Sequence, residues 1–179
     1  MINGERIILR ALNQNDFQKV LEWANNPQLK YLTGTIYPVS ELEHETWMKN
    51  KIIDKTERLF GIQDKTNNQL IGLVGLKKMD FINRNTELYI YIGEENYWGK
   101  GLGSEATSVA TKFAFDELNF HRVYLMVFSY NTRAINSYEK VGFRKEGILK
   151  DSLYKSGKYH DKVLMALIKP LYKEFKYDK

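Results

Sequence analysis

The sequence predicts a single mixed α/β domain, and three observations support this fold class. Between residues 58 and 92, short segments rich in β-branched, aromatic and aliphatic residues alternate with turn-forming residues. A glycine-rich loop past the middle of the chain opens an amphipathic helix. The expected order is one strand, two helices, three strands, a helix, a strand, a helix and two strands, which is a mixed α/β layout.

The first elements are a strand and a helix. Arg6–Leu12 has the composition of a strand. A helix should follow, with Asn15 or Asp16 near its N-cap and an apolar face at helical spacing. Pro27 is expected to end this segment, because proline lacks the N–H that a helix interior needs.

A second helix should begin at Ser40, whose side chain can form a capping box with Glu43, and continue to about Ile53. The period then changes from helical to extended. Three antiparallel strands joined by hairpins are expected at Arg58–Gln63, Leu70–Met79 and Thr86–Ile92.

The last elements follow the glycine-rich loop. In the next helix, Leu102, Ala106, Val109 and Phe113 fall on one face. The remaining elements are a strand at Arg122–Phe128, a helix at Thr132–Val141 ended by Gly142, and strands at Phe143–Leu149 and Lys162–Ile168.

Size and composition suit one domain over residues 1–179, since domains commonly have about 100–200 residues. No segment approaches the ~18 consecutive apolar residues of a membrane span, and the N-terminus lacks a signal-peptide layout. We therefore expect a cytoplasmic protein without a membrane partner. The absence of cysteine excludes a thiol nucleophile, a disulfide framework and a cysteine-ligated zinc site.

The net charge of +5 suits an anionic ligand and is also compatible with nucleic acid. The charges alternate in sign along most of the chain, and no dense run of lysine and arginine is present. A mixed, solvated surface with a small positive excess is the simpler explanation.

The loop with Gly99, Lys100, Gly101 and Gly103 is the sharpest feature of the sequence. A helix N-terminus presents unpaired N–H groups and partial positive charge, and glycines let the backbone approach an anion closely. We expect this loop to bind a phosphate or pyrophosphate. A glycine-rich turn that caps a core helix is the alternative, although three alternating glycines and a lysine exceed what a turn requires.

Two commoner phosphate motifs do not match this loop. The P-loop requires Ser or Thr directly after Gly-Lys. Here Gly101 follows Gly99-Lys100, and Leu102 comes next. The dinucleotide fingerprint that starts at Gly99 requires a third glycine at position 104, which is Ser104. That fingerprint also normally opens the first βαβ unit of a chain.

The segment Trp98–Gly103 resembles the pyrophosphate loop of the GNAT superfamily, Gln/Arg-x-x-Gly-x-Gly/Ala, with Trp98 in place of the usual Gln or Arg. The downstream pattern Asn131-x-x-Ala134-x-x-x-Tyr138-x-x-x-Gly142-Phe143 is similar as well. The resemblance extends over nearly the whole chain. It implies an acetyl-CoA-dependent N-acetyltransferase with a single mixed, mostly antiparallel GNAT-type sheet flanked by helices on both faces.

The same resemblance implies where acetyl-CoA, the co-substrate, would bind. Main-chain groups of Tyr91, Ile92 and Gly93 would pair with the pantetheine arm, and Asn131 and Lys140 would lie along the far side of the cofactor. The pyrophosphate would be held by Trp98, Gly99, Lys100, Gly101, Leu102, Gly103 and Ser104. No metal is expected, because His44, His121 and His160 lack paired spacing. His160 is a candidate for the border of the acceptor pocket.

Acetyl transfer by direct attack in a ternary complex requires a neutral amine and a proton for the departing thiolate. The resemblance makes Tyr138 the acid and Glu87 the base that draws the amine proton through water. For Tyr138, a place in the helical stripe of Ala134, Ile135 and Val141 indicates packed core as the alternative. For Glu87, a solvated or hydrogen-bonded strand carboxylate is an equal alternative.

The acceptor amine stays open at this stage. The chain is most similar to the ribosomal-protein N-terminal acetyltransferases and the spermidine acetyltransferases, so a polyamine or small amine and a protein N-terminus are both candidates. The spermidine enzymes carry an acidic cluster where this chain has Gly34–Tyr37, and Glu41, Glu43 and Glu45 follow shortly after. Dimers are frequent among such relatives, so a homodimer is a further expectation.

Two other classes are weighed against an enzyme. A basic nucleic-acid-binding module is suggested by the C-terminal segment, where lysines alternate with Tyr172, Phe175 and Tyr177. Glu174 and Asp178 interrupt that run, so nucleic acid is not the expected partner. The other class is a protein that binds acetyl-CoA without turnover.

Overall fold

The computed structural model describes residues 1–171. The C-terminal run of lysines and aromatic residues that suggested nucleic-acid binding, from residue 172 to residue 179, lies outside the described residues. Within the described part of the chain, no helix is long and apolar enough to cross a bilayer.

The described strands form one sheet in the order β1-β2-β3-β4-β5-β6-β8-β7. Their bounds are β1 Ile2–Asn3, β2 Ile7–Arg10, β3 Arg58–Asp64, β4 Leu70–Asp80, β5 Asn85–Ile92, β6 Arg122–Phe128, β7 Arg144–Lys155 and β8 Lys158–Ile168. Among these neighbours β5 and β6 run parallel, and the other described pairs are antiparallel. The prediction of a single mixed, mostly antiparallel sheet is confirmed.

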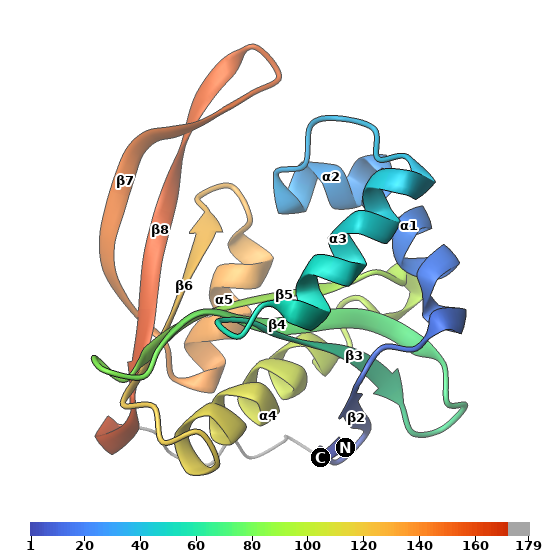
Figure 1. The fold of residues 1–179 in the computed structure, drawn as a ribbon. Coiled ribbons are helices and arrows are strands. Elements are labelled where there is room, and N and C mark those ends of the chain that lie inside the picture. Colours follow the sequence, from blue (N-terminus) through green and yellow to red (C-terminus); the bar gives the residue numbers. More distant parts are fainter. Residues whose placement is uncertain (172–179) are drawn as a thin grey trace.

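Helices cover both faces of this sheet, as predicted (Figure 1). Their bounds are α1 Phe17–Asn25, α2 Pro27–Thr33, α3 Glu41–Ile53, α4 Leu102–Asp116 and α5 Thr132–Val141, with single 3-10 turns at Gln14–Asp16, Glu95–Tyr97 and Lys169–Leu171. Helices α1 to α3 lie on one side, which we call the α3 face, and α4 lies on the other, the α4 face (Figure 1).

Local signals explain where the helices begin and end. The predicted capping box of α3 forms between Ser40 and Glu43, and Gly142 ends α5 in the left-handed conformation at φ 111°. The sequence analysis missed α2. Pro27 follows the end of α1, as predicted, but it also begins α2, where its missing N–H has no cost and Asn26 caps the helix through the Leu29 N–H.

The final hairpin is longer than predicted. Strand β7 continues to Lys155 and β8 begins at Lys158, around a turn with Gly157 at φ 80°. The added part of β7 is mostly polar, with only Leu153 and Lys155 half-buried, so few apolar residues mark it as a strand in the sequence. This hairpin projects beyond the rest of the sheet (Figure 1).

Two apolar clusters hold the helices on the sheet. On the α4 face, Phe115, Phe120 and Phe143 are fully or almost fully buried together with the aliphatic residues of the central strands. On the α3 face, a smaller cluster is built around Val20 and Trp23. Each fully buried aliphatic or aromatic side chain contributes about 1.5–3 kcal/mol, so these clusters fix the two faces on which the site is built.

Strands β5 and β6 form a fork. They pair only where Asn85–Glu87 meets Arg122–Tyr124, and β6 then continues against β8 while β5 continues against β4. Beyond Glu87, the β6-side edge of β5 has no strand partner in the described part of the chain. An open strand edge offers N–H and C=O groups to an extended ligand.

Candidate active site

The glycine-rich loop ends at the N-terminus of α4, beside the open part of the fork. Gly99 and Gly101 adopt left-handed conformations, with φ of 76° and 77°, where another L-residue would cost roughly 1–2 kcal/mol. Gly101 is the N-cap of α4 and no side chain caps the helix. The N–H groups of the first helical turn therefore remain available to an anion.

The glycines of this loop leave space that the protein does not fill. A Cβ at Gly99 would meet nothing within 4 Å, and a Cβ at Gly103 would meet only the Ile92 Cγ1, at 3.8 Å. Gly75, by contrast, is filled by the Tyr89 ring, to which a Cβ would come as close as 2.3 Å. Packing does not explain a glycine at position 103, and the residues present fit a pyrophosphate lying against the helix N-terminus.

Arg6 and Glu105 brace the loop from behind, a feature that the sequence analysis missed. The Glu105 carboxylate is fully buried in the first turn of α4 and accepts the backbone N–H groups of Arg6 at 2.7 Å and Ile7 at 3.3 Å. The Arg6 guanidinium donates to Glu105 Oε2 at 2.9 Å and to the Lys100 carbonyl oxygen at 3.0 Å. The loop is thereby tied to the start of β2.

Two of the main-chain positions expected to pair with pantetheine already have partners. The Gly93 N–H donates to the Ile71 carbonyl at 2.8 Å, and the Ile92 carbonyl accepts the Trp98 Nε1–H at 2.8 Å. Gly93 is glycine for a packing reason, because a Cβ there would lie 2.2 Å from the Trp23 ring. Any pairing of this edge with an extended ligand has to accommodate the bond from Trp98.

Trp98 and Asn131 line one open cleft of about 540 Å³ between α2, the glycine-rich loop and the start of α5. Its lining residues are Pro27, Gln28, Tyr31, Leu32, Trp98, Tyr130, Asn131, Thr132 and Arg133. The Arg133 guanidinium lies 4.4 Å from the centre of the Trp98 ring, so a cation sits over the indole face inside the cleft. The Trp98 side chain thus contacts Arg133 and donates to the Ile92 carbonyl.

Asn131 caps α5 and lines the cleft, whereas Lys140 does neither. The Asn131 side-chain oxygen accepts the Ala134 N–H at 3.2 Å and so caps α5. Lys140 is exposed near the end of the same helix and is not among the residues that line the cleft.

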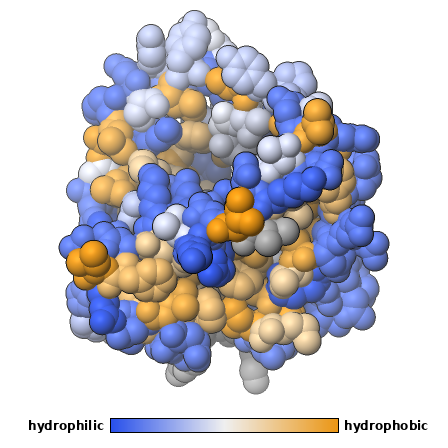
Figure 2. All heavy atoms as spheres, viewed as in Figure 1, coloured by the Kyte–Doolittle hydropathy of each residue, from blue (hydrophilic) through white to orange (hydrophobic). Residues whose placement is uncertain are grey.

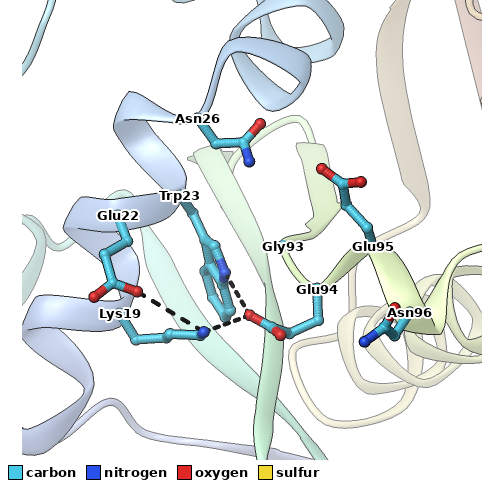
Figure 3. A pocket seen from close by; sticks show the side chains of 8 residues that line it. All are labelled: Lys19, Glu22, Trp23, Asn26, Gly93, Glu94, Glu95 and Asn96. Atoms are coloured by element: carbon cyan, nitrogen blue, oxygen red, sulfur yellow. Dashed lines mark hydrogen bonds and ion pairs between the residues drawn. The ribbon is translucent and has the colours of Figure 1, made fainter.

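A second pocket of about 270 Å³ lies at the end of β5 against α1 (Figure 3). Its most buried polar groups are already paired, since Glu94 Oε1 accepts the Trp23 Nε1–H at 2.9 Å and lies 2.7 Å from Lys19 Nζ. Burial would raise the pKa of Glu94, but the bonds from Lys19 and Trp23 lower it. We therefore attribute to this pocket a supporting role for the end of β5.

Tyr138 belongs to the core of the α4 face and retains an uncommitted hydroxyl. The residue is 9% exposed, and its ring lies 6.1 Å from that of Phe143. Among residues 1–171 its hydroxyl makes no hydrogen bond, and burial raises the pKa of Tyr138 to about 12. A phenol in this state stays protonated at neutral pH and can act as a proton donor.

Glu87 is a buried, ionised carboxylate at the point of the fork. It is 5% exposed, and it pairs across the parallel ladder with Tyr124. Lys77 Nζ lies 3.0 Å from its Oε1, and Lys78 Nζ lies 2.8 Å from its Oε2. Burial alone would raise the pKa of Glu87, but the two ammonium groups outweigh it and the pKa is lowered.

The two candidate catalytic side chains lie on opposite faces of the sheet. Leu88 is part of the α4-face core, so its neighbour Glu87 points to the α3 face, while Tyr138 packs on the α4 face. The buried phenol and the buried carboxylate are thus separated by the sheet.

The histidines are spread as the sequence indicated. His44 is a buried core residue, with its Nε2 3.2 Å from the Phe17 carbonyl oxygen and its ring stacked on Trp47. His160 lies beside the Tyr130 ring, whose hydroxyl donates to the Tyr31 carbonyl at 2.7 Å. The described residues contain no group of three ligand side chains that could hold a metal ion.

Comparison with known proteins gives a consistent family. The protein-family model for the acetyltransferase (GNAT) domain matches residues 6–144 of the sequence. Spermidine N(1)-acetyltransferase of Vibrio cholerae is 33% identical over 94% of this chain and 96% of its own length. A putative ribosomal N-acetyltransferase of Bacillus subtilis is 28% identical over 93% of each chain.

A solved structure shares the whole architecture. The crystal structure of spermidine N-acetyltransferase from Vibrio cholerae in complex with CoA and spermine superposes with a TM-score of 0.86 and 32% identity. The match covers 93% of this chain and 98% of that one. Both groups named by the sequence resemblance are therefore found among the relatives.

Proposed function

The chain belongs to the GNAT acetyltransferase family and is an N-acetyltransferase that uses acetyl-CoA as co-substrate, and we propose that it acetylates a small primary amine at the β5–β6 fork. The observation that carries this proposal is the placement of a glycine-rich helix N-terminus, an open strand edge, a buried phenol and a buried carboxylate around one fork.

In this proposal the chain holds the co-substrate at two places. The N–H groups at the start of α4 and the space over Gly103 receive the pyrophosphate, with Lys100 nearby as a cation. The open edge of β5 receives the pantetheine arm, and Trp98 and Asn131 line the cleft beside it. Bound there, acetyl-CoA supplies the activated acyl group as a thioester.

The chemical step then uses both faces of the sheet. The amine nitrogen forms a bond to the thioester carbonyl carbon, and the carbon–sulfur bond breaks. Glu87 accepts the amine proton through water, and the Tyr138 hydroxyl gives a proton to the departing thiolate. Both residues return to their starting states by proton exchange with water, and the products are an amide and CoA.

For the acceptor we propose a chemical class, a small primary amine, and not a single compound. The relatives are named as spermidine N(1)-acetyltransferase and as a putative ribosomal N-acetyltransferase, so a polyamine is the first candidate acceptor. The segment Gly34–Tyr37, between α2 and α3, contributes no carboxylate to bind a polycation. A homodimer and a peptide acceptor stay predictions of the family resemblance, as does a cytoplasmic location.

The proposal is tested by incubating the protein with acetyl-CoA and spermidine, simple monoamines, amino acids or N-terminal peptides, and identifying acetylated products by mass spectrometry. Formation of one amide class with stoichiometric CoA supports the proposal. If acetyl-CoA binds in calorimetry and no amine in the panel is acetylated, the chain is a binder without turnover and the proposed function is wrong.

A further inference from the structure

The α3 face at the fork contains more positive than negative charge. Its two buried carboxylates are Glu87, held by Lys77 and Lys78, and Glu57, which is 6% exposed. Glu57 Oε2 lies 2.5 Å from Lys51 Nζ, and its Oε1 accepts the Tyr89 hydroxyl at 2.6 Å. Each acid is therefore already neutralised by lysine, and neither is left to bind a second ammonium group of an acceptor.

Lys77 and Lys78 reach the same carboxylate although they are consecutive residues of one strand. Neighbouring side chains in a regular strand point to opposite faces. Here the β4–β5 register shifts between Lys77 and Asp80, and Lys78 adopts φ 51°, which is unusual for a residue other than glycine. This bulge brings a second cation to the α3 face beside Glu87.

Both ammonium groups retain donors for a ligand. The side chain of Lys77 is 35% exposed and that of Lys78 is 62% exposed. An ammonium group has three N–H donors, and within residues 1–171 each lysine is engaged in one ion pair, with Glu87. The remaining donors of Lys77 and Lys78 can hold an anion close to the carboxylate that we propose as the base.

Two lysines of the β7–β8 hairpin, Lys155 and Lys162, add positive charge. Lys162 Nζ lies 5.7 Å from the Phe128 ring centre on the hairpin side, and Lys155 Nζ lies 5.2 Å from the Tyr31 ring centre. Lys155 Nζ also donates to the Lys30 carbonyl oxygen at 2.5 Å, and within residues 1–171 neither lysine forms an ion pair with a carboxylate. In the space-filling view the surface is hollowed between the β7–β8 hairpin and helices α2 and α3 (Figure 2).

We propose that the acceptor is a primary amine that also carries an anionic group, a carboxylate or a phosphate, and that Lys77 and Lys78 hold this group beside Glu87. The inference rests on the proposed function of the same site. The proposed acceptor differs from the polyamines that the names of the relatives suggest. A polyamine would place a second cation next to these lysines, which would repel it.

Three amines of equal chain length test the inference: 5-aminopentanoate, pentylamine and 1,5-diaminopentane, which differ only in the charge of the far end. We expect kcat/KM to fall in that order, with the anionic amine ahead of the diamine on the order of tenfold and the gap narrowing at high salt. Comparing phosphoethanolamine with ethanolamine in the same assay distinguishes phosphate from carboxylate recognition.

Variants separate anion recognition from damage to the base. In Lys78→Gln, a weakened Glu87 lowers the rate for all three amines alike, whereas loss of the anion contact lowers the ratio of 5-aminopentanoate to 1,5-diaminopentane severalfold. Lys49→Gln is the matched control, because Lys49 is exposed on α3 and pairs with Glu45. Its ratio should equal that of the wild type.

A preference for 1,5-diaminopentane or spermidine, or a ratio unchanged by Lys78→Gln, overturns the inference. If no amine is acetylated, the proposed function fails and the inference is decided by calorimetry on the CoA-loaded protein with glutarate as probe. Glutarate binding that is lost in Lys78→Gln supports anion recognition by this face, and absence of glutarate binding overturns it.

Discussion

The Arg6 guanidinium and the Glu105 carboxylate form an ion pair, with 2.9 Å between Nε and Oε2, that joins the start of β2 to the glycine-rich loop. Glu105 is fully buried in the first turn of α4, where it places a negative charge close to the proposed pyrophosphate. Arg6 neutralises that charge and also holds the Lys100 carbonyl. We infer that the pair sets both the shape and the potential of the loop.

Arg6→Ala should therefore weaken acetyl-CoA binding on the order of tenfold and lower the free energy of unfolding by about 1–2 kcal/mol. The cost is moderate because the Arg6 side chain is 45% exposed and Glu105 keeps its two backbone N–H bonds. Calorimetric titration with CoA and urea unfolding measure the two effects. Lys65→Ala is the control, since it removes the same charge from a lysine that holds the Gly4 carbonyl. Equal CoA affinity in both variants would contradict the role of Arg6.

Gly103→Ala should change folding and binding in opposite directions. Alanine favours a helix over glycine by up to about 1 kcal/mol, and the new Cβ meets only Ile92 at 3.8 Å, so the variant should be at least as stable as the wild type. The methyl group would occupy the space proposed for pyrophosphate, so CoA affinity should fall at least severalfold. Gly147→Ala, on exposed β7 with nothing within 4 Å, should leave CoA affinity unchanged. Wild-type affinity in Gly103→Ala would place the pyrophosphate elsewhere.

The pH dependence of the reaction should follow the amine and not Glu87. The pKa of Glu87 is lowered in the folded protein by Lys78 and Lys77 against the effect of burial, so the carboxylate is ionised throughout the neutral range. We expect kcat/KM to rise with pH until the acceptor amine is deprotonated. Glu87→Gln should lower kcat on the order of 100-fold, and the shape of the pH profile should stay that of the wild type. A wild-type kcat in Glu87→Gln would return Glu87 to a structural role.

Acidification should destabilise the protein through His44. Burial lowers the pKa of His44 below its usual 6.5, so the unfolded chain binds a proton at a pH where the folded protein does not. The free energy of unfolding should therefore decrease as pH falls through about 6.5. Urea unfolding at pH 7.5 and pH 5.5 measures the decrease, which His44→Gln should reduce. His121→Gln, at an exposed position, should keep the wild-type dependence. A pH dependence unaffected by His44→Gln would contradict this assignment.

Sequence could predict the elements whose signals are local. The capping box at Ser40, the glycine that ends α5 and the glycine-rich entry to α4 all act within a few residues, and all three are present. Helix α2 was not predicted because Pro27 both follows the end of α1 and occupies the first turn of α2, with Asn26 as the N-cap between them.

The contacts that complete the site could not be predicted because they join distant or irregular parts of the chain. Arg6 and Glu105 are 99 residues apart and meet only through the packing of β2 on α4. Lys77 and Lys78 reach one carboxylate only because of the bulge in β4, which breaks the alternation that a sequence pattern assumes. Trp98 departs from the family motif, and its bond to the Ile92 carbonyl depends on how the loop folds back on β5.

The most direct test of the account follows thiol release from acetyl-CoA in the presence of an accepted amine, comparing wild type with Tyr138→Phe. Because the Tyr138 hydroxyl makes no hydrogen bond among residues 1–171, the variant should fold as stably as the wild type and bind CoA equally well. Tyr89→Phe, which removes the hydroxyl of a half-buried tyrosine bonded to Glu57, serves as the control. We predict that Tyr138→Phe lowers kcat about 100-fold or more with little change in KM, as loss of a general acid requires. An unchanged kcat would show that Tyr138 is a core residue and would contradict the proposed mechanism.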